Sequence, residues 1–334
     1  MKYSHVYILD CGSYTGGGEA LHQLGCDLID LGYKVSMVRR IGAICCPTPK
    51  MEKYYHHGLE SISFDEIVDD EINLLVVPET ATYELYRVKN ITKMVWWLSY
   101  TYYDGHIWWN SALSFRRMIS EGLPRNLKHL LKRCLYKLKY NSSSYPLENV
   151  INVAGSNYAL NLLNKKMHIR AHVLFHSIGV DFLDAGMYTE KSGRKDVVLY
   201  NPAKQSRIMD KLLKRHKFEF IPIANLNCEQ MINLFRQSKL YIDFGNFPGP
   251  ERLPKETVFN GVNLLVWYHN AAQTDDVLIP NKYKVSEKAS ISNIEEFIGK
   301  MLINYDADFN DFSAFRFYIA NMENQYYKDL QTLF

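Results

Sequence analysis

The sequence has 334 residues, of which 47% are hydrophobic and 22% charged, so it is long enough for two ordinary globular domains. A formal net charge of +3 gives no overall indication of nucleic-acid binding, and any basic surface must be local. The six cysteines include no Cys-x-x-Cys pair, which favours a reducing cytoplasm over a disulfide framework. The chain begins directly with a predicted strand, and no apolar run approaches the roughly 18–20 residues of a membrane span. We therefore expect neither a signal peptide nor a transmembrane helix.

The first predicted unit is a strand, a glycine-rich turn, a helix and a second strand. The strands cover residues 5–11 and 34–38, and leucines recur at helical spacing between them. The turn contains Gly16, Gly17 and Gly18, but it matches neither G-x-G-x-x-G nor a P-loop. Gly17 and Gly18 would let the backbone approach a ligand closely, and a turn that only needs positive φ is the alternative.

Two further predicted strands, at residues 74–79 and 93–98, extend this pattern to a parallel, doubly wound sheet. The loop after the second of them holds Asp104 and His106 among aromatic residues. A histidine beside a carboxylate could act as a general base at the carboxyl end of a strand. A purely structural role for both residues is the alternative.

The stretch from Arg116 to Tyr140 differs from its surroundings because it carries eight basic residues against the single acid Glu121. Leucines at helical spacing give it an apolar stripe. A basic amphipathic helix is typical of binding to an anionic membrane surface. A solvent-exposed helix face would show the same pattern.

The second half begins a new strand and helix series. Strands are predicted at residues 171–178, 196–201 and 218–223, and a helix at residues 228–238. Lys204 follows the second of these strands, where its ammonium could reach a phosphate as a point charge. The alternative is an exposed lysine on a turn. Two successive series indicate two Rossmann-like domains with a ligand cleft between them.

The loop between strands 239–245 and 262–267 is the strongest site candidate in the sequence. Its prolines restrict the backbone, and charged residues crowd into a few positions. We expect Glu256 at the start of a short helix, where free amides favour a polar, anion-binding pocket. A capped helix with exposed ion pairs is the alternative. The candidate residues of this loop are Pro248, Gly249, Glu251, Arg252 and Glu256.

Taken in order, these motifs resemble those of GT-B glycosyltransferases over most of the chain. Gly16-Gly-Gly18 resembles the family's first turn, and Gly179-Val-Asp181 resembles the entry to its C-terminal domain. Pro202-Ala-Lys204 resembles the family's Pro-Glu-Lys-Gly, and the segment from Glu256 to Gly261 resembles the end of its E-x7-E motif. The central loop is closer still to a bacterial subgroup from surface-polysaccharide (O-antigen and capsule) gene clusters.

The resemblance implies an α/β architecture of two Rossmann-like domains facing across a cleft. Residues 1–177 would form the acceptor domain, residues 178–305 the donor domain, and residues 306–334 a helix that returns to the first domain. Lys204 and Arg252 would bind the donor phosphates, and Glu256 the donor ribose or sugar. Gly17, Gly18, Pro248 and Gly249 would also contact the donor.

Two departures from the family pattern affect the catalytic assignment. The arginine expected before the family's lysine is missing, and the first glutamate of E-x7-E is absent from its usual position. Glu251 or Arg252 could substitute for that glutamate at a shorter spacing, and Asp104 and His106 are the other catalytic candidates. Retaining and inverting chemistry both stay open.

The resulting hypothesis is transfer of a sugar from a nucleotide-activated donor to a hydroxyl of a growing, lipid-linked bacterial surface glycan. No Asp-x-Asp directly follows a predicted strand, so we expect no metal and no other cofactor. The enzyme would be cytoplasmic, with peripheral binding to the inner membrane face through the basic stretch, and would not bind nucleic acid. A nucleotide-sugar 2-epimerase and an inactive nucleotide- or glycan-binding subunit are the alternatives.

Overall fold

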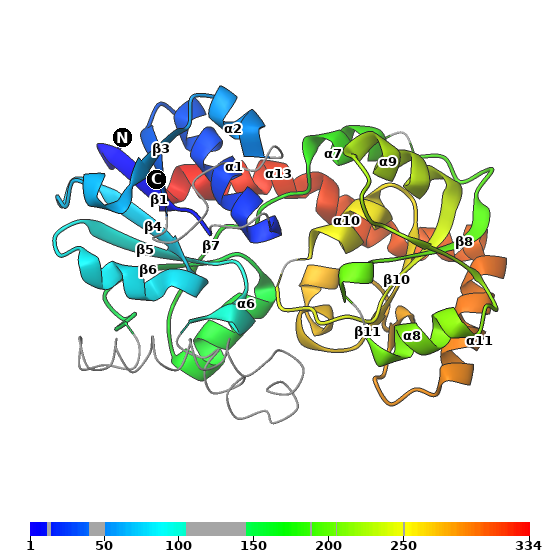
Figure 1. The fold of residues 1–334 in the computed structure, drawn as a ribbon. Helices are drawn as coiled ribbons and strands as arrows, with labels where there is room; N and C mark the ends of the chain where they lie inside the picture. The colour runs from blue at the N-terminus through cyan, green and yellow to red at the C-terminus, as the bar shows by residue number, and fades with distance from the viewer. Residues whose placement is uncertain (12–14, 40–50, 105–144, 188, 205, 250) are drawn as a thin grey trace. The chain divides into compact units, whose positions relative to one another are not determined.

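The computed structural model contains two parallel β-sheets flanked by helices (Figure 1). It describes residues 1–334 except 12–14, 40–50, 105–144, 188, 205 and 250. The described chain divides into two compact units. The first comprises Met1–Leu174 with Asp329–Phe334, and the second comprises Phe175–Lys328. The predicted α/β class with two parallel sheets is confirmed.

The sheet of the first unit has the strand order β3-β2-β1-β4-β5-β6-β7, and its recorded pairs are all parallel. The central strands are buried on both faces because helices or turns cover each side of a parallel sheet. The strands are β1 (His5–Leu9), β2 (Lys34–Arg39), β3 (Glu60–Ser63), β4 (Leu74–Pro78), β5 (Thr92–Trp97), β6 (Ile151–Ala154) and β7 (His172–Val173).

Helix α1 (Gly16–Asp30) follows β1 and shows how local sequence sets its ends. The Thr15 hydroxyl caps the start by accepting a hydrogen bond from the Gly18 amide at 3.1 Å. Gly32, with φ of +88°, lies just past the end, in a conformation that glycine adopts without strain. The other helices described in this unit are α2 (Glu52–His56) and α6 (Asn157–Leu162).

Two adjacent tryptophans at the end of β5 connect this strand to β6 and to the residue that follows β7. Both indoles are buried and both find acceptors for their N–H groups, as buried indoles usually do. Trp96 donates to the Leu174 carbonyl at 3.1 Å, and Trp97 donates to the Asn152 amide oxygen at 2.9 Å.

The second unit contains a five-stranded sheet with the order β12-β11-β10-β8-β9, again with parallel pairs. Its strands are β8 (Lys195–Tyr200), β9 (Glu219–Pro222), β10 (Ser238–Asp243), β11 (Asn263–Trp267) and β12 (Lys284–Val285). The helices are α7 (Val180–Gly186), α8 (Arg207–Lys214), α9 (Cys228–Gln237), α10 (Arg252–Phe259), α11 (Ile291–Ile303), α12 (Tyr305–Asp308) and α13 (Ser313–Leu333).

Several 3₁₀ helices and the π-helical turn η5 connect many of these elements. They are η2 (Phe64–Glu66), η3 (Glu79–Arg87), η4 (Tyr100–Tyr102), η5 (Leu163–Met167), η6 (Pro202–Lys204), η7 (Asn270–Gln273), η8 (Asp275–Val277), η9 (Asn281–Tyr283) and η10 (Phe309–Phe312).

The last helix, α13, ends in the first unit, which its final residues Asp329–Phe334 join. There the Lys2 ammonium donates to the Leu333 carbonyl at 3.1 Å, and the Tyr33 hydroxyl donates to the Phe334 carbonyl. The second unit begins at Phe175, close to the predicted residue 178. Of the predicted segment 306–334, the last six residues group with the first unit.

Three details of the predicted elements are wrong. The predicted strand at 171–178 is reduced to β7 (His172–Val173), and the short strands β3 and β12 were not predicted. Helix α10 begins at Arg252, so Glu256 lies in its second half rather than at its start. Pro254 is compatible with this early start because the first turn of a helix needs no internal amide donor.

Candidate functional site

The second sheet has a topological switch point between β8 and β10. From β8 the chain first builds β9 on one side, and then returns to build β10 on the other side. The crossover connections leave in opposite directions at this point, which opens a crevice at the carboxyl ends of the two strands. Open α/β sheets bind their ligands at such a crevice.

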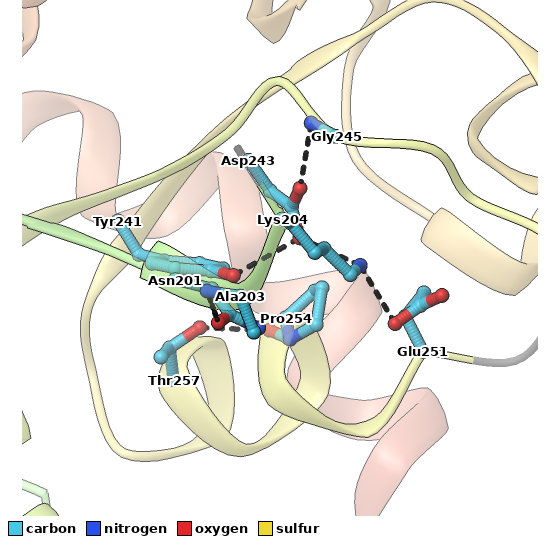
Figure 2. A network of polar contacts seen from close by, with 9 residues as sticks. All are labelled: Asn201, Ala203, Lys204, Tyr241, Asp243, Gly245, Glu251, Pro254 and Thr257. Carbon is cyan, nitrogen blue, oxygen red and sulfur yellow. Dashed lines mark hydrogen bonds and ion pairs between the residues drawn. The ribbon is translucent and has the colours of Figure 1, made fainter. Parts of the chain in front are cut away.

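Lys204 lies at this switch point, in the turn η6 that directly follows β8. The turn is closed by the Lys204 amide, which donates to the Asn201 carbonyl at 3.1 Å. The lysine ammonium lies 3.0 Å from Oδ2 of Asp243 and 2.7 Å from Oε2 of Glu251. Figure 2 shows the side chain directed between these two carboxylates. Only 19% of the Lys204 side chain is exposed, so the alternative of an exposed lysine on a turn is wrong.

Asp243 ends strand β10 and is itself held in place. Its Oδ2 accepts a hydrogen bond from the Tyr241 hydroxyl, and its Oδ1 accepts one from the Gly245 amide, both at 3.0 Å. A Cβ at residue 245 would lie 2.7 Å from the Cβ of Lys204, so the close approach requires glycine. The turn after β10 is therefore shaped around the lysine.

Lys204, Asp243 and Glu251 form a cluster of charged side chains, here called the lysine cluster. Burial and the ion pairs within this cluster shift the pKa values of Lys204 and Glu251. Burial alone would lower the pKa of Lys204, but Glu251 and Asp243 outweigh it and raise the pKa above its usual value. Lys204 therefore stays a cation. Burial raises the pKa of Glu251, and nearby Asp243 acts in the same direction against the attraction of Lys204. Two carboxylates therefore share one ammonium.

Glu251 occupies the N-cap position of α10 without capping it. Its side chain makes no hydrogen bond to the first-turn amides of the helix, and pairs with Lys204 instead. Arg252 and Glu256 lie one turn apart on the same helix, with 3.5 Å between Nε and Oε1. Lys255 is buried among these charges, and burial lowers its pKa to about 8. The start of α10 thus combines helix-terminal amides with three basic side chains, counting Lys204.

A cavity of about 480 Å³ opens beside this cluster at the carboxyl edge of the sheet. Gly245, which touches the stem of Lys204, is one of its lining residues. The others come from the carboxyl end of β11 and from the segments that follow β8, β10, β11 and β12: Ser206, Phe244, Asn246, Trp267, His269, Asn270 and Glu287. Its size and its mixture of aromatic and polar groups suit a small-molecule ligand.

Solved glycosyltransferase structures share this architecture over nearly the whole chain. A glycosyltransferase from Rickettsia africae has a TM-score of 0.60 at 11% identity, with 99% of each chain covered. LpCGTa, solved in complex with UDP, has a TM-score of 0.55 at 10% identity, covering 99% of this chain and 98% of its own. Sucrose-phosphate synthase from Thermosynechococcus elongatus has a TM-score of 0.53 at 11% identity, covering 99% and 95%. The chain has the GT-B fold.

No protein-family model matches the sequence, and no curated protein matches it at a significant level. Identities near 11% establish the GT-B fold alone. The resemblance of the central loop to the surface-polysaccharide subgroup stays a prediction.

The other donor-site candidates fall into both units of the GT-B fold. Gly17 and Gly18 lie in the first turn of α1, where a Cβ on Gly17 would contact Leu98 at 3.4 Å. Pro248 and the buried Gly249 belong to the segment between β10 and α10. They therefore adjoin Glu251 along the chain, whereas the two glycines of α1 belong to the first unit.

The catalytic candidates of the first unit are only partly described. Asp104 accepts a hydrogen bond from the Thr82 hydroxyl at 2.5 Å and one from the Tyr83 amide at 3.3 Å, which ties it to η3. His106 and the stretch from Arg116 to Tyr140 lie outside the described residues. The catalytic roles of Asp104 and His106 stay predictions.

Sequence reasoning did not single out Asp243, His269, Glu287 or the buried Glu79. Asp243 could have been found, because an acid that ends an apolar strand just before a glycine is a signal for a site at a sheet edge. His269 and Glu287 follow two other strands, but only the sheet order brings them to one cavity. Within the described residues, no cluster of three or more metal-ligating side chains occurs, and no helix is long and apolar enough to cross a membrane.

Proposed function

We propose that the protein is a glycosyltransferase that moves a sugar from a nucleotide-activated donor to an acceptor hydroxyl. The observation that carries the proposal is the Lys204 ammonium at the β8/β10 switch point, held by two carboxylates beside a ligand-sized cavity. The GT-B fold, shared with solved glycosyltransferases, supports the same reaction class.

Departure of a nucleoside diphosphate develops negative charge, which the site is suited to stabilise. An ammonium has three N–H donors, and Asp243 and Glu251 engage two of those of Lys204. The third would serve a phosphate oxygen. Arg252 and the amides at the start of α10, which Glu251 leaves uncapped, would add to this stabilisation. We propose that these groups, rather than a metal, offset the charge.

The two glutamates of α10 have different proposed roles. Glu251 shares an ammonium with the donor phosphates, so its carboxylate would lie near the sugar carbon that gains positive charge in the transition state. Glu256 lies one turn further along the helix and would bind the donor ribose or sugar. Pro248 and Gly249 would shape the loop that precedes them, and Gly17 and Gly18 would approach the donor from the first unit.

The acceptor is proposed to be a lipid-linked bacterial surface glycan of the O-antigen or capsule type. The central loop supports this proposal through its resemblance to enzymes of such gene clusters. The basic stretch from Arg116 to Tyr140 supports it by suiting an anionic lipid surface on the cytoplasmic side.

Nucleotide binding tests the donor site directly. Thermal stabilisation should be measured with UDP, GDP, dTDP, ADP and CMP, since binding to the native state raises stability by RT ln(1 + [L]/Kd). Lys204→Met should weaken binding of the preferred diphosphate about 100-fold, because charge-assisted bonds to the phosphates are lost. The matched control is Lys211→Met, which removes an exposed lysine from α8. Equal binding by both variants would rule out the proposed phosphate site.

Release of nucleoside diphosphate from the donor sugar tests the reaction itself. We expect release to increase when a lipid-linked glycan fraction is added, as a transferase requires. Conversion of the nucleotide sugar to an isomer without any acceptor would contradict transfer and identify an epimerase. Binding without either reaction would identify an inactive binding subunit.

A further inference from the structure

We infer that the cavity beside Lys204 recognises guanine, so that the donor is a GDP-sugar. This inference rests on the proposed function, because it assumes that the donor diphosphate binds at Lys204. It adds the identity of the base, which the fold does not determine.

The cavity is placed to receive the base of a nucleotide whose phosphates are at Lys204. Gly245 lies against the Lys204 stem and also lines the cavity, so the cavity lies next to the lysine. From there it extends along the carboxyl ends of β10, β11 and β12 to Glu287. A nucleoside attached to the bound phosphates would therefore enter it.

The lining of the cavity also carries a carboxyl group, Glu287, next to a histidine, His269. Oε1 of Glu287 lies 2.8 Å from the buried Nδ1 of His269, off the direction of an ideal ring N–H hydrogen bond. Burial lowers the pKa of His269, so its ring is neutral at pH 7. The Glu287 side chain is 63% exposed, and a carboxylate has lone pairs for several donors. It can accept from a ligand while it contacts His269.

Only one common base matches such a carboxylate. Guanine presents two adjacent donors, N1–H and the 2-amino group, which can bind both carboxylate oxygens. Uracil and thymine present one N–H between two carbonyl oxygens, which a carboxylate repels. Adenine and cytosine present an amino group beside a ring nitrogen that is itself an acceptor. Hydrogen bonds to a charged group are the stronger kind, so the difference should be large.

The rest of the lining fits a purine. Phe244 and Trp267, whose ring centroids lie 4.4 Å apart, form the aromatic part of the lining. Both are largely buried, at 2% and 7% exposure, so they shape the cavity rather than offer a wide stacking face. The Asn270 side-chain amide donates to the Asn246 amide oxygen at 2.6 Å, which places two amide groups at the cavity. Amide N–H groups are suitable donors to the guanine O6 and N7 acceptors.

The test compares GDP, inosine diphosphate, UDP and ADP by calorimetric titration. Inosine diphosphate lacks only the 2-amino group of guanine, so it isolates one of the two proposed bonds to Glu287. We expect GDP to bind the wild type most tightly, with inosine diphosphate weaker by about tenfold. Glu287→Gln should reduce GDP affinity by at least about tenfold and bring GDP and inosine diphosphate to similar affinities. The matched control, Glu296→Gln, removes an exposed acid of α11 and should keep the wild-type preference.

The outcomes separate this inference from the proposed function. Tighter binding of UDP or ADP than of GDP, or an unchanged preference in Glu287→Gln, would overturn guanine recognition. The donor site would stand in that case if Lys204→Met still removes nucleotide binding. If no nucleotide binds the wild type, or if Lys204→Met binds nucleotide with wild-type affinity, the proposed function fails. This inference then fails with it.

Discussion

Both sheets place acidic side chains with little exposure at their carboxyl edges, but these acids have different partners. In the first unit, Glu79 accepts hydrogen bonds from the amides of Leu98 at 2.9 Å and Ser99 at 3.1 Å. In the second unit, Asp243 and Glu251 pair with the Lys204 ammonium. The first arrangement uses the backbone as donor, and the second uses a charged side chain.

The difference separates a structural carboxyl group from a candidate site. Backbone amides are fixed in the fold, so the donors to Glu79 cannot turn to a ligand. Burial raises the pKa of Glu79 to about 8, which keeps it mainly protonated and neutral at pH 7. An ammonium keeps its charge and has three donors, so Lys204 can bind a phosphate oxygen beside its two carboxylate partners. We therefore expect substitutions of Glu79 to change stability, and substitutions around Lys204 to change binding or turnover.

The largest expected effect is on the stability of the first unit. Glu79→Ala would leave the buried amides of Leu98 and Ser99 without their acceptor, at a cost of about 3 kcal/mol. Denaturant unfolding should show this loss as a lower midpoint, with an unchanged slope. Nucleotide affinity, measured well below the transition, should match the wild type. Weakened binding in the folded variant would show that Glu79 belongs to the site.

The pH dependence of stability should sharpen the same contrast. The folded protein holds the Glu79 proton up to pH about 8, whereas the unfolded chain releases it near pH 4.5. Between these values the folded state binds more protons, so raising the pH lowers the free energy of unfolding by at most about 1.4 kcal/mol per pH unit. Glu79→Gln cannot titrate and should lose this part of the slope. Parallel wild-type and variant curves from pH 5 to 8 would exclude a raised pKa.

A methyl group added at Gly245, at the carboxyl edge of the second sheet, should disturb Lys204 and its two carboxylate partners. Gly245→Ala would place Cβ 2.7 Å from Cβ and 2.9 Å from Cδ of Lys204, so the side chain must move. We expect about 1–3 kcal/mol of destabilisation and a clear loss of nucleotide affinity. Gly299→Ala is the control: its Cβ would meet only Phe218, at 3.9 Å, and alanine favours the helix. Full nucleotide affinity in Gly245→Ala would mean that the position of Lys204 is unimportant.

The smallest effects should distinguish the two glutamates of α10. Glu256→Gln should weaken nucleotide binding about tenfold, because a charged acceptor is lost from the donor contact. Glu251→Gln should leave binding unchanged or tighter, since it removes an acid that competes for Lys204, and should lower kcat. Calorimetry with kinetics on both proteins separates these cases. Normal turnover in Glu251→Gln would show that Glu251 is only a structural partner of Lys204. Asp104 would then be the next candidate for the catalytic carboxylate.

The sequence predicted long elements well because their patterns are local. Apolar runs and leucine spacing identified the central strands and α1, and the order of the motifs indicated two Rossmann-like series. Short elements were harder. Strand β3 has a single apolar residue, Ile62, and β12 has only two residues, so neither shows a strand pattern. Their pairing depends on longer neighbours already in the sheet. The start of α10 was misplaced because the prolines were interpreted as loop residues.

The sequence by itself determined the fold class and the position of Lys204 after a buried strand, since both follow from residues close together in the chain. Only the tertiary structure decided what surrounds the lysine. Strand β9 intervenes in the sequence between β8 and β10, yet β10 is the neighbour of β8 in the sheet. That crossover brings Asp243 and Glu251 onto Lys204, and the strand order beyond it brings His269 and Glu287 to one cavity. Partners separated by tens of residues leave no local pattern, because their contact is a property of strand order rather than of spacing.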